Sequence, residues 1–525
     1  MLVAALLVSL VAGCGKPKGP TKGGTITFGM TGDPVIFNPI LSTDVPSSQV
    51  SDLVYSGLVK LNENLEPTGD LAERWESSSD GLTWTFHLRK GVKFHDGTPL
   101  TSADVKYTYD AIKDKDYTGV RATDFEPIES IETPDEYTVV LKLVEPYAPL
   151  LTNLTYGILP KHLFETTSIA QMKENPANMQ PIGTGPYKYK EWQKGQYILL
   201  EANPDYFGGA PNIEKVIFKF YQDNLVMLAA LEKGDIDYMG TIPADEVDRI
   251  KKDYADKFDF KEIADLGFTY IGLKQTNPLF TDVRVRQALM YGANRQQIVT
   301  DVLKGRAEVM NANLPSPSWG YAGDKLNQYA FDPDKAKALL EEAGWKVGSD
   351  GIRVKDGKRF SFKLITSTGN KTLEAALNII QQNWKDIGVE ANIEYIEWSV
   401  LCSQYLDVAK FEAYALGWSL GVDPDFYLYF HSKSAVEDGQ LVGFNDVEFK
   451  NADLDKLLEE GRREMDQAKR KEIYLQAEKI VNEQLPYVFL YSQHVTSAMN
   501  KRVQGVVWTT QGWMDLHKWY VSDGK

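Results

Sequence analysis

Phe360-Ser-Phe-Lys-Leu-Ile-Thr366 and Val389-Glu-Ala-Asn-Ile-Glu-Tyr395, with the residues that join them, decide the fold class. The first segment is typical of a buried strand, and the second alternates apolar and polar residues with the period of a strand. Between them a stripe of apolar residues recurs at helical spacing and ends at Gly388: Leu373, Leu377, Ile380, Trp384 and Ile387. Strand, helix and strand in this order predict a βαβ unit with a right-handed crossover.

Strands and helices also alternate elsewhere in the chain. A strand predicted from Glu214 to Tyr221 is followed by a helix over Asn224 to Lys233, which Gly234 closes. Thr101-Ser-Ala-Asp104 resembles a capping box, and Asp332-Pro333 is a typical helix start. The chain has 525 residues, more than one hydrophobic core usually serves. This interleaving predicts an α/β protein with two lobes.

The N-terminus has the pattern of an export signal. A short apolar run ends in Val11-Ala12-Gly13-Cys14, which resembles the lipobox of bacterial lipoproteins. The resemblance implies a signal peptide over 1–13, lipidation of Cys14 and a tether over 14–23. The protein would then be extracytoplasmic, in the periplasm or at the outer face of the cytoplasmic membrane. The alternative is a buried N-terminal segment that happens to end in cysteine.

Composition narrows the classes of partner. The net charge of −16 argues against nucleic acid, because binding phosphates requires a basic surface. No later segment holds the long apolar run of a membrane-spanning helix. Cys402 is the only cysteine besides Cys14, so we expect a small buried apolar residue rather than a disulfide.

Catalytic and metal-binding signatures are missing from the sequence. It holds neither a Gly-x-Ser-x-Gly elbow nor a His-Glu-x-x-His motif. The six histidines are scattered without metal-ligand spacing: His87, His95, His162, His431, His494 and His517. Asp423-Pro424-Asp425 could be an acid–base pair or a turn with solvated carboxylates. We therefore expect no catalytic residues, metal or cofactor, and keep an exported hydrolase as the alternative of another class.

Four segments together resemble family 5 of the bacterial extracellular solute-binding proteins, the peptide-binding subunits of ABC importers. They are Leu71 to Val105, which contains Trp75-Glu and Asp80-Gly-Leu-Thr-Trp84; Gly183-Thr-Gly-Pro-Tyr187; Asn277 to Leu289; and Leu416-Gly-Trp418 through Asp423-Pro-Asp425. The resemblance extends from about Gly24 to Tyr520. No single segment is specific, but the four together are.

The resemblance implies a two-lobed periplasmic-binding-protein fold, with a hinge of two crossing strands and a subdomain inserted in lobe one. Lobe one would cover 24–275, with the insertion over 71–184, and the chain would return to it over 492–525. Lobe two would cover 276–491. The crossing strands would be Phe268 to Lys274 and Val488 to Tyr491.

The same resemblance implies that a monomer captures oligopeptides in the cleft between the lobes and delivers them to the permease of an ABC importer. An extended peptide would be held through its main chain, as a strand is added to a sheet. The implied ligand-binding residues are Trp418, Asp423, Trp398, Tyr491 and Tyr270. The alternative for each aromatic residue is ordinary core packing.

The Trp418 motif departs from the family pattern. Many relatives carry, three residues after this tryptophan, an aspartate that pairs with the α-amino group of the ligand, whereas this chain has Gly421. Asp423 is then either a substitute anchor or a residue that shapes the turn before Pro424. The departure also keeps an oligosaccharide or another non-peptide solute open as the ligand.

Overall fold

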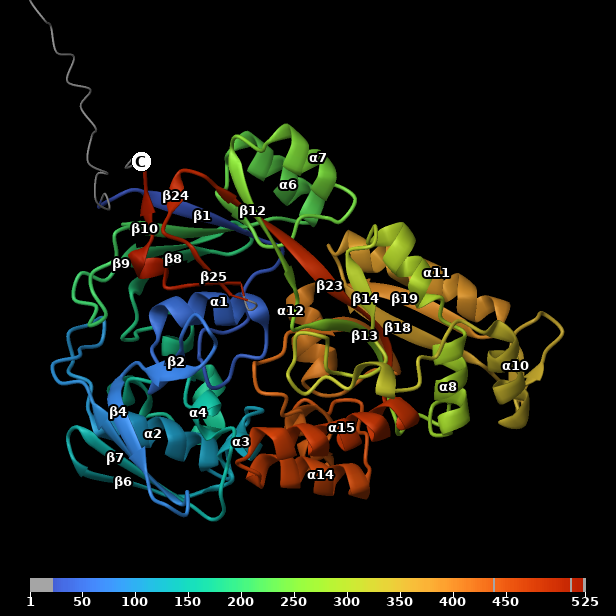
Figure 1. The fold of residues 1–525 in the computed structure, drawn as a ribbon, viewed down its shortest axis with the longest axis horizontal. Coiled ribbons are helices and arrows are strands. Elements are labelled where there is room, and N and C mark those ends of the chain that lie inside the picture. The colour runs from blue at the N-terminus through green and yellow to red at the C-terminus, as the bar shows by residue number, and fades with distance from the viewer. Residues whose placement is uncertain (1–21, 438–439, 510–511, 523–525) are drawn as a thin grey trace, which may run out of the picture.

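The computed structural model describes residues 22–437, 440–509 and 512–522, so the predicted signal peptide and Cys14 lie outside the described residues. Figure 1 shows two bodies side by side, one formed by the N-terminal part of the chain with its C-terminal end, the other by the middle of the chain. Each body has its own hydrophobic core. The core of lobe two is drawn from residues 268–491, and that of lobe one from residues 26–238 and 499–521.

The predicted βαβ unit is confirmed and forms the centre of lobe two. It consists of β18 (Ser361–Ser367), α11 (Lys371–Asp386) and β19 (Glu390–Ile396), and the two strands pair in parallel. Trp384 explains how α11 is fixed, because its ring is fully buried and its indole N–H donates to the Leu289 carbonyl at 2.9 Å. The sheet continues from β18 through β20 (Ala413–Trp418) to β13 (Phe268–Leu273).

The remaining elements of lobe two surround this sheet (Figure 1). Its helices are α8 (Val283–Tyr291), α9 (Arg295–Gln297), α10 (Pro333–Glu342), α12 (Trp398–Leu401), α13 (Tyr427–Phe430), α14 (Ala452–Arg463) and α15 (Gln467–Gln484). Its short strands are β14 (Ala307–Val309), β15 (Lys346–Val347), β16 (Arg353–Lys355), β17 (Lys358–Arg359), β21 (Val436–Glu437) and β22 (Gln440–Leu441). Cys402, which follows α12, is free and buried, as expected from the sequence.

One long strand, β23 (Tyr487–Asn500), belongs to the sheets of both lobes. Its first residues pair antiparallel with β13, and its last residues pair with β12 (Phe258–Ala264) and β11 (Tyr238–Met239) of lobe one. The chain therefore passes between the lobes twice, between β12 and β13 and again within β23. The two segments expected as crossing strands pair with each other on the lobe-two side.

Lobe one is built on a mixed sheet. It contains β1 (Thr25–Met30), β10 (Lys215–Phe220), β9 (Tyr197–Ala202) and β8 (Tyr187–Gln193), with β1 and β10 parallel. Helix α6 (Asn224–Lys233) ends as predicted at Gly234, whose φ of 85° suits a residue without a side chain. The other elements are α1 (Val45–Val54), α7 (Val247–Asp253), β2 (Val59–Leu61), β3 (Pro67–Gly69), β24 (Val503–Gln504), β25 (Val507–Thr509), β26 (Gly512–Met514) and β27 (Tyr520–Val521).

A separate sheet lies below these elements in Figure 1. Its strand order is β4 (Ala72–Ser77), β5 (Thr83–Leu88), β7 (Thr138–Leu143) and β6 (Ile128–Asp135). Helix α2 (Ser102–Lys113) covers it and begins with the predicted capping box, in which the side chains of Thr101 and Asp104 each accept a backbone N–H. The short helices α3 (Ala122–Phe125), α4 (Leu150–Asn153) and α5 (Lys161–Phe164) complete this subdomain.

Within the described ranges, no helix has both the length and the apolar character needed to cross a membrane.

Candidate functional site

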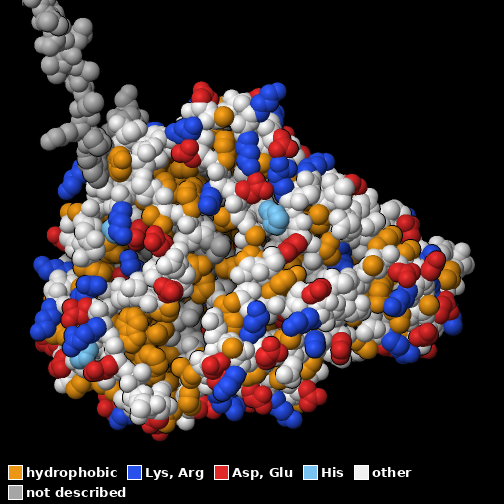
Figure 2. Space-filling model, in the orientation of Figure 1, with side chains coloured by type: hydrophobic (Ala, Val, Ile, Leu, Met, Phe, Trp, Pro, Cys, Tyr) orange, Lys and Arg blue, Asp and Glu red, His pale blue; other side chains and the backbone are white. Residues whose placement is uncertain are grey.

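A hollow separates much of the facing surfaces of the two lobes (Figure 2). Residues from opposite lobes also approach each other directly. A Cβ placed on Gly32 of lobe one would lie 3.7 Å from the indole of Trp398, the first residue of α12 in lobe two. The neighbouring carboxylates Asp33 and Glu397 also come from opposite lobes. Burial raises the pKa of Asp33, and the like charge of Glu397 adds to this effect.

Trp418 lies at the end of β20, where its half-buried indole is held by other aromatic rings. Its ring stacks on Tyr270 with the centroids 6.1 Å apart, and the rings of Tyr429 and Phe444 lie 5.0 and 5.1 Å away. Its indole N–H donates to the Tyr487 hydroxyl at 3.4 Å. A tryptophan held in this way offers a rigid contact surface with few rotors left to immobilise.

Behind Trp418, a chain of buried hydroxyl groups ends on a carboxylate. The hydroxyls of Tyr270 and Tyr414 are 2.7 Å apart, and Tyr414 donates to Asp446 at 2.9 Å. Burial raises the pKa of Asp446 to about 7, although the Tyr414 hydrogen bond acts in the opposite direction. Tyr270 is only 1% exposed, so it supports Trp418 from the core side.

The five residues that the sequence indicated do not form one cluster. Trp418 and Tyr270 are stacked, whereas Trp398 makes no ring contact with either of them within the described residues. Tyr491 is also 1% exposed and lies where β23 pairs with both β13 and β14. In this arrangement a ligand can therefore contact Trp398 and Trp418 directly, whereas Tyr270 and Tyr491 are covered by the protein.

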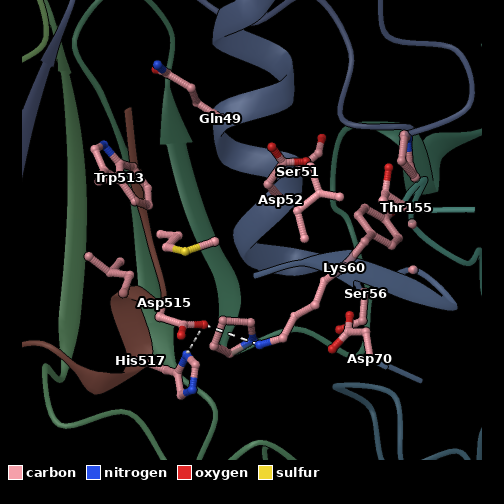
Figure 3. A pocket seen from close by; sticks show the side chains of 18 of the residues that line it. Gln49, Ser51, Asp52, Ser56, Lys60, Asp70, Thr155, Trp513, Asp515 and His517 are labelled. Atoms are coloured by element: carbon pink, nitrogen blue, oxygen red, sulfur yellow. Dashed lines mark hydrogen bonds and ion pairs between the residues drawn. The ribbon is translucent and has the colours of Figure 1, made fainter. Parts of the chain in front are cut away.

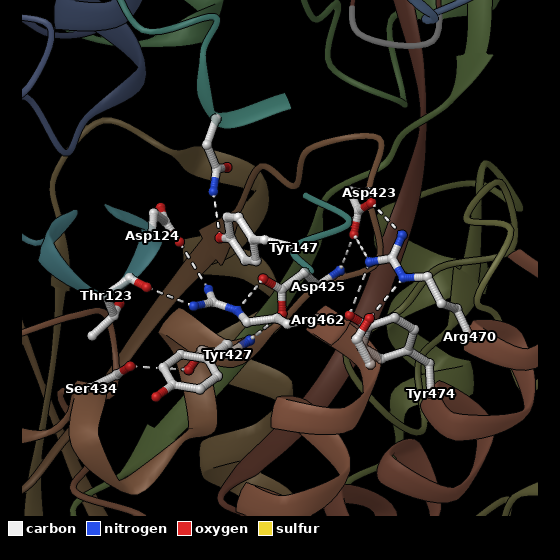
Figure 4. Close-up of polar contacts among 12 residues, drawn as sticks. Thr123, Asp124, Tyr147, Asp423, Asp425, Tyr427, Ser434, Arg462, Arg470 and Tyr474 are labelled. Carbon is white, nitrogen blue, oxygen red and sulfur yellow. Dashed lines mark hydrogen bonds and ion pairs between the residues drawn. The ribbon is translucent and has the colours of Figure 1, made fainter. Parts of the chain in front are cut away.

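Asp423 is already paired within lobe two. Both of its carboxylate oxygens accept hydrogen bonds of 2.8 Å from Arg470 of α15 (Figure 4). One of them also accepts the backbone N–H of Asp425 at 3.0 Å, which closes the turn around Pro424. Desolvation would lower the pKa of Arg470, but the pair with Asp423 raises it above its ordinary value. The turn alternative of the sequence analysis thus has direct geometric support.

Arg462 of α14 connects the two lobes, and sequence reasoning missed it. Its guanidinium donates to Asp425 at 2.7 Å within lobe two. It also donates to the Thr123 carbonyl at 2.7 Å and to Asp124 at 2.9 Å, both on the subdomain of lobe one (Figure 4). The guanidinium lies 3.8 Å from the ring centre of Tyr427, and its side chain is 7% exposed.

At this contact the guanidinium of Arg462 donates to two carboxylates, and that of Arg121 lies near enough to Asp124 to lower its pKa as well. Burial raises the pKa of Asp124 to about 6, while Arg462 pulls it down and the nearby Asp425 pushes it up. The same carboxylates raise the pKa of Arg462, which stays charged. Among the described residues, no group of three or more His, Cys, Asp or Glu side chains converges as a metal site would require.

Comparisons with known proteins agree with this architecture. Residues 66–438 match the model of the bacterial extracellular solute-binding proteins, family 5. The chain is 37% identical over 513 residues to the oligopeptide-binding protein AppA of Bacillus subtilis, covering 96% of this chain and 92% of that protein. It is 31% identical to the dipeptide-binding protein of Escherichia coli, covering 92% of each.

Two solved structures resemble the fold closely. The structure of Bacillus subtilis AppA in complex with a nonapeptide has a TM-score of 0.91 and covers 96% of this chain and 99% of that one, at 37% identity. NikZ of Campylobacter jejuni in complex with Ni(L-His) has a TM-score of 0.85 at 28% identity, covering 94% of this chain and 99% of that one.

Proposed function

Because the chain belongs to family 5 of the bacterial extracellular solute-binding proteins, we propose that it captures oligopeptides between its lobes and delivers them to the permease of an ABC importer. The observation that carries the peptide assignment is the 37% identity, over nearly the whole chain, to a protein named as an oligopeptide-binding protein. The neighbour bound to Ni(L-His) keeps a non-peptide solute as the second candidate.

The ligand would lie against Trp418 and Trp398, with Tyr270 and Tyr491 supporting the cleft wall from behind. The half-buried indole of Trp418, held by its aromatic neighbours, supports this role. Asp423 as the partner of the positive end of a ligand stays a prediction, and its ion pair with Arg470 competes with that role. An anchor for the α-amino group is needed only if the ligand carries a free amine.

Native mass spectrometry of freshly purified protein tests the ligand class. A co-purified distribution of peptide masses is the expected result. A single sugar or metal-complex mass would replace the peptide assignment, and a protein that gains no mass from any oligopeptide library would contradict it.

Closure of the lobes over the ligand is the proposed mechanism, as in hinge closure around ligands in other binding proteins. Saturating peptide should lower the radius of gyration in small-angle scattering. It should also stabilise the fold by about 2.7 kcal/mol at a hundredfold excess over the dissociation constant. An unchanged radius of gyration in the presence of bound peptide would contradict closure.

Attachment to the membrane through a lipid on Cys14 completes the proposal. Cys14→Ala should release the protein from the membrane fraction and leave the affinity for peptide unchanged, since Cys14 precedes the folded lobes. One acyl chain holds a protein only marginally, so the proposal assumes multiple acylation. A Cys14→Ala protein that remains with the membranes would contradict the anchor.

A further inference from the structure

A cavity of about 420 Å³ lies in lobe one, a volume within the range of small-molecule sites. Its walls include residues of α1, β2, β26 and the turn before β27, and none of the described residues that line it lies between 276 and 491. Figure 3 shows Trp513, Asp515 and His517 on one side, with Asp52 on α1 and Asp70 beyond it. Movement of lobe two would therefore leave this lining intact.

The charged groups of this cavity leave an excess of negative charge. Three carboxylates line it, Asp52, Asp70 and Asp515. Lys60 is the cation among the lining residues, 3.3 Å from Asp515, and Lys518, outside the lining, pairs with the same carboxylate at 2.5 Å, so the excess lies on Asp52 and Asp70. Burial lowers the pKa of His517 to about 4, so this imidazole is neutral at pH 7.

Asp52 is the carboxylate that has no partner. Within the part of the chain that the structure describes, no hydrogen bond or ion pair reaches it, and its side chain opens onto the cavity. Its side chain is exposed to the cavity, but the protein around the cavity limits its hydration and raises its pKa to about 6, and the charge of Arg121 lowers it by a smaller amount. Arg121 itself donates to the Tyr156 hydroxyl and to the Ser42 carbonyl. A carboxylate so placed has acceptor capacity that the protein does not use.

Two aromatic residues of the lining, Tyr55 and Trp513, offer further contacts for a ligand. Tyr55 is 4% exposed, and its hydroxyl has no hydrogen-bond partner among the described residues, which is costly for a buried polar group. Trp513 contributes a half-buried indole, and its ring is held by Phe28 and Trp519 at 5.1 and 5.4 Å. The face of an indole attracts organic cations.

We propose that this cavity binds an alkylammonium or guanidinium group, with Asp52 as its ion-pair partner. An anion would meet three carboxylates. A divalent metal would lack ligands, because no group of three or more metal-ligating side chains converges among the described residues. The cationic group has two possible sources, a free small molecule or a basic side chain of a peptide held between the lobes. The second source rests on the proposed function, and the first does not.

Calorimetry with three probes tests this site. The probes are cadaverine, a peptide with a central lysine, and the same peptide with norleucine in place of lysine. Asp52→Asn removes the charge at nearly constant shape, and the exposed Asp256→Asn is the matched control on lobe one. The expected result is that Asp52→Asn weakens cadaverine or the lysine peptide about tenfold or more and leaves the norleucine peptide unchanged.

The pattern of losses identifies the source of the cation. Weaker binding of cadaverine assigns the site to a free cation, and a loss confined to the lysine peptide assigns it to a ligand side chain. Equal affinities of the wild type and Asp52→Asn for both cationic probes, or no binding of either probe to the wild type, would overturn the inference. Failure of the norleucine peptide to bind the wild type would instead contradict the proposed function.

Tyr55→Phe provides a second variant that retains the fold, since it removes a hydroxyl that has no partner. The cationic probe that Asp52→Asn weakens should also bind Tyr55→Phe less tightly than the wild type. The loss should be smaller than in Asp52→Asn, because a neutral hydrogen bond contributes less than a charged one. Thermal melting should show neither variant to be less stable than the wild type. A cationic probe that binds Tyr55→Phe and Asp52→Asn as tightly as the wild type excludes this site.

Discussion

Asp423 and Asp425 are two residues apart in one turn, yet their arginine partners connect different parts of the molecule. Arg470 holds Asp423, and both residues belong to lobe two. Arg462 holds Asp425 and also reaches Asp124 on the subdomain of lobe one. The first pair should therefore persist when the lobes separate, whereas the second contact is complete only when they meet. The Arg470–Asp423 pair therefore stabilises lobe two itself, whereas the contacts of Arg462 stabilise the closed arrangement of the lobes.

Arg462→Met should have the largest effect. It should weaken closure of the lobes rather than the stability of either lobe. Closing would then bury Asp124, whose side chain is 4% exposed, without the guanidinium that donates to it. Breaking a buried pair on one side typically costs about 3–5 kcal/mol, so the affinity for peptide should fall by two or more orders of magnitude. Calorimetry measures the affinity, and small-angle scattering of the free protein measures the open fraction. If Arg462→Met binds peptide with wild-type affinity, Arg462 does not stabilise closure.

Asp423→Asn should come next, and it should act on stability. It removes the charge from two hydrogen bonds to Arg470, whose side chain is 6% exposed, and charged hydrogen bonds contribute about 1.5–3 kcal/mol. Thermal or urea unfolding measures the loss.

The same variant decides between the two roles left open for Asp423. Peptides with a free and with an acetylated α-amino group should lose affinity equally if Asp423 only shapes the turn. A loss confined to the free amine would show that it anchors the ligand.

A change of pH should affect closure less than either of these substitutions affects the protein. The pKa of Asp124 is about 6 in this arrangement against an ordinary value of 3.8. We expect the ordinary value when the lobes are apart, so closing takes up a proton between these values. Affinity should then rise as the pH falls from about 6 towards 4, by less than tenfold per pH unit, and should not change with pH well above 6.

A peptide that is blocked at both ends and has no ionisable side chain isolates the contribution of the protein, because the ligand itself does not titrate. Asp124→Asn should remove the larger part of the pH dependence, although it also weakens the contact with Arg462, and a smaller part with the same sign should remain from Asp33, whose pKa is raised by burial and by Glu397 of the other lobe. A blocked peptide whose affinity rises with pH between 4 and 6 would give the opposite sign and refute the argument.

Arg463→Leu should have the smallest effect. Arg463 is adjacent to Arg462 and pairs with Glu145 of the same subdomain at 2.9 Å, but both side chains are 43% exposed. Exposed pairs contribute about 0.2–1 kcal/mol and are screened by salt. This variant is thus the matched control for Arg462→Met, measured by the same calorimetry. An equally large loss would mean that burial is not what distinguishes the two arginines.

Local signals in the sequence were enough to predict much of the fold. The capping box at Thr101, the end of α6 at Gly234 and the βαβ unit around Trp384 each depend on residues close together in the chain. The interleaving of strands and helices predicted two α/β lobes, whereas the hinge strands and the inserted subdomain were implied by a family resemblance.

The arginine pairs could not be predicted in this way. Arg462 and Arg470 lie in charged helices that resemble solvated surfaces, and their partners Asp124 and Asp423 are 338 and 47 residues away. Nothing near an arginine in the sequence states that its side chain will be buried. The place of Trp418 in the site was suggested by the resemblance, and its contact with a ligand stays a prediction.

The shared strand β23 also has a consequence for how the protein is made. It lies between β13 of lobe two and β11 of lobe one, and every other strand of this sheet comes earlier in the chain. Neither half of the sheet is complete until residues 487–500 have been synthesised. A nascent chain therefore lacks a central strand for most of its translation, and such long-range strand pairing forms slowly. The late position of β23 should keep the polypeptide unfolded long enough for an export machinery to thread it across a membrane.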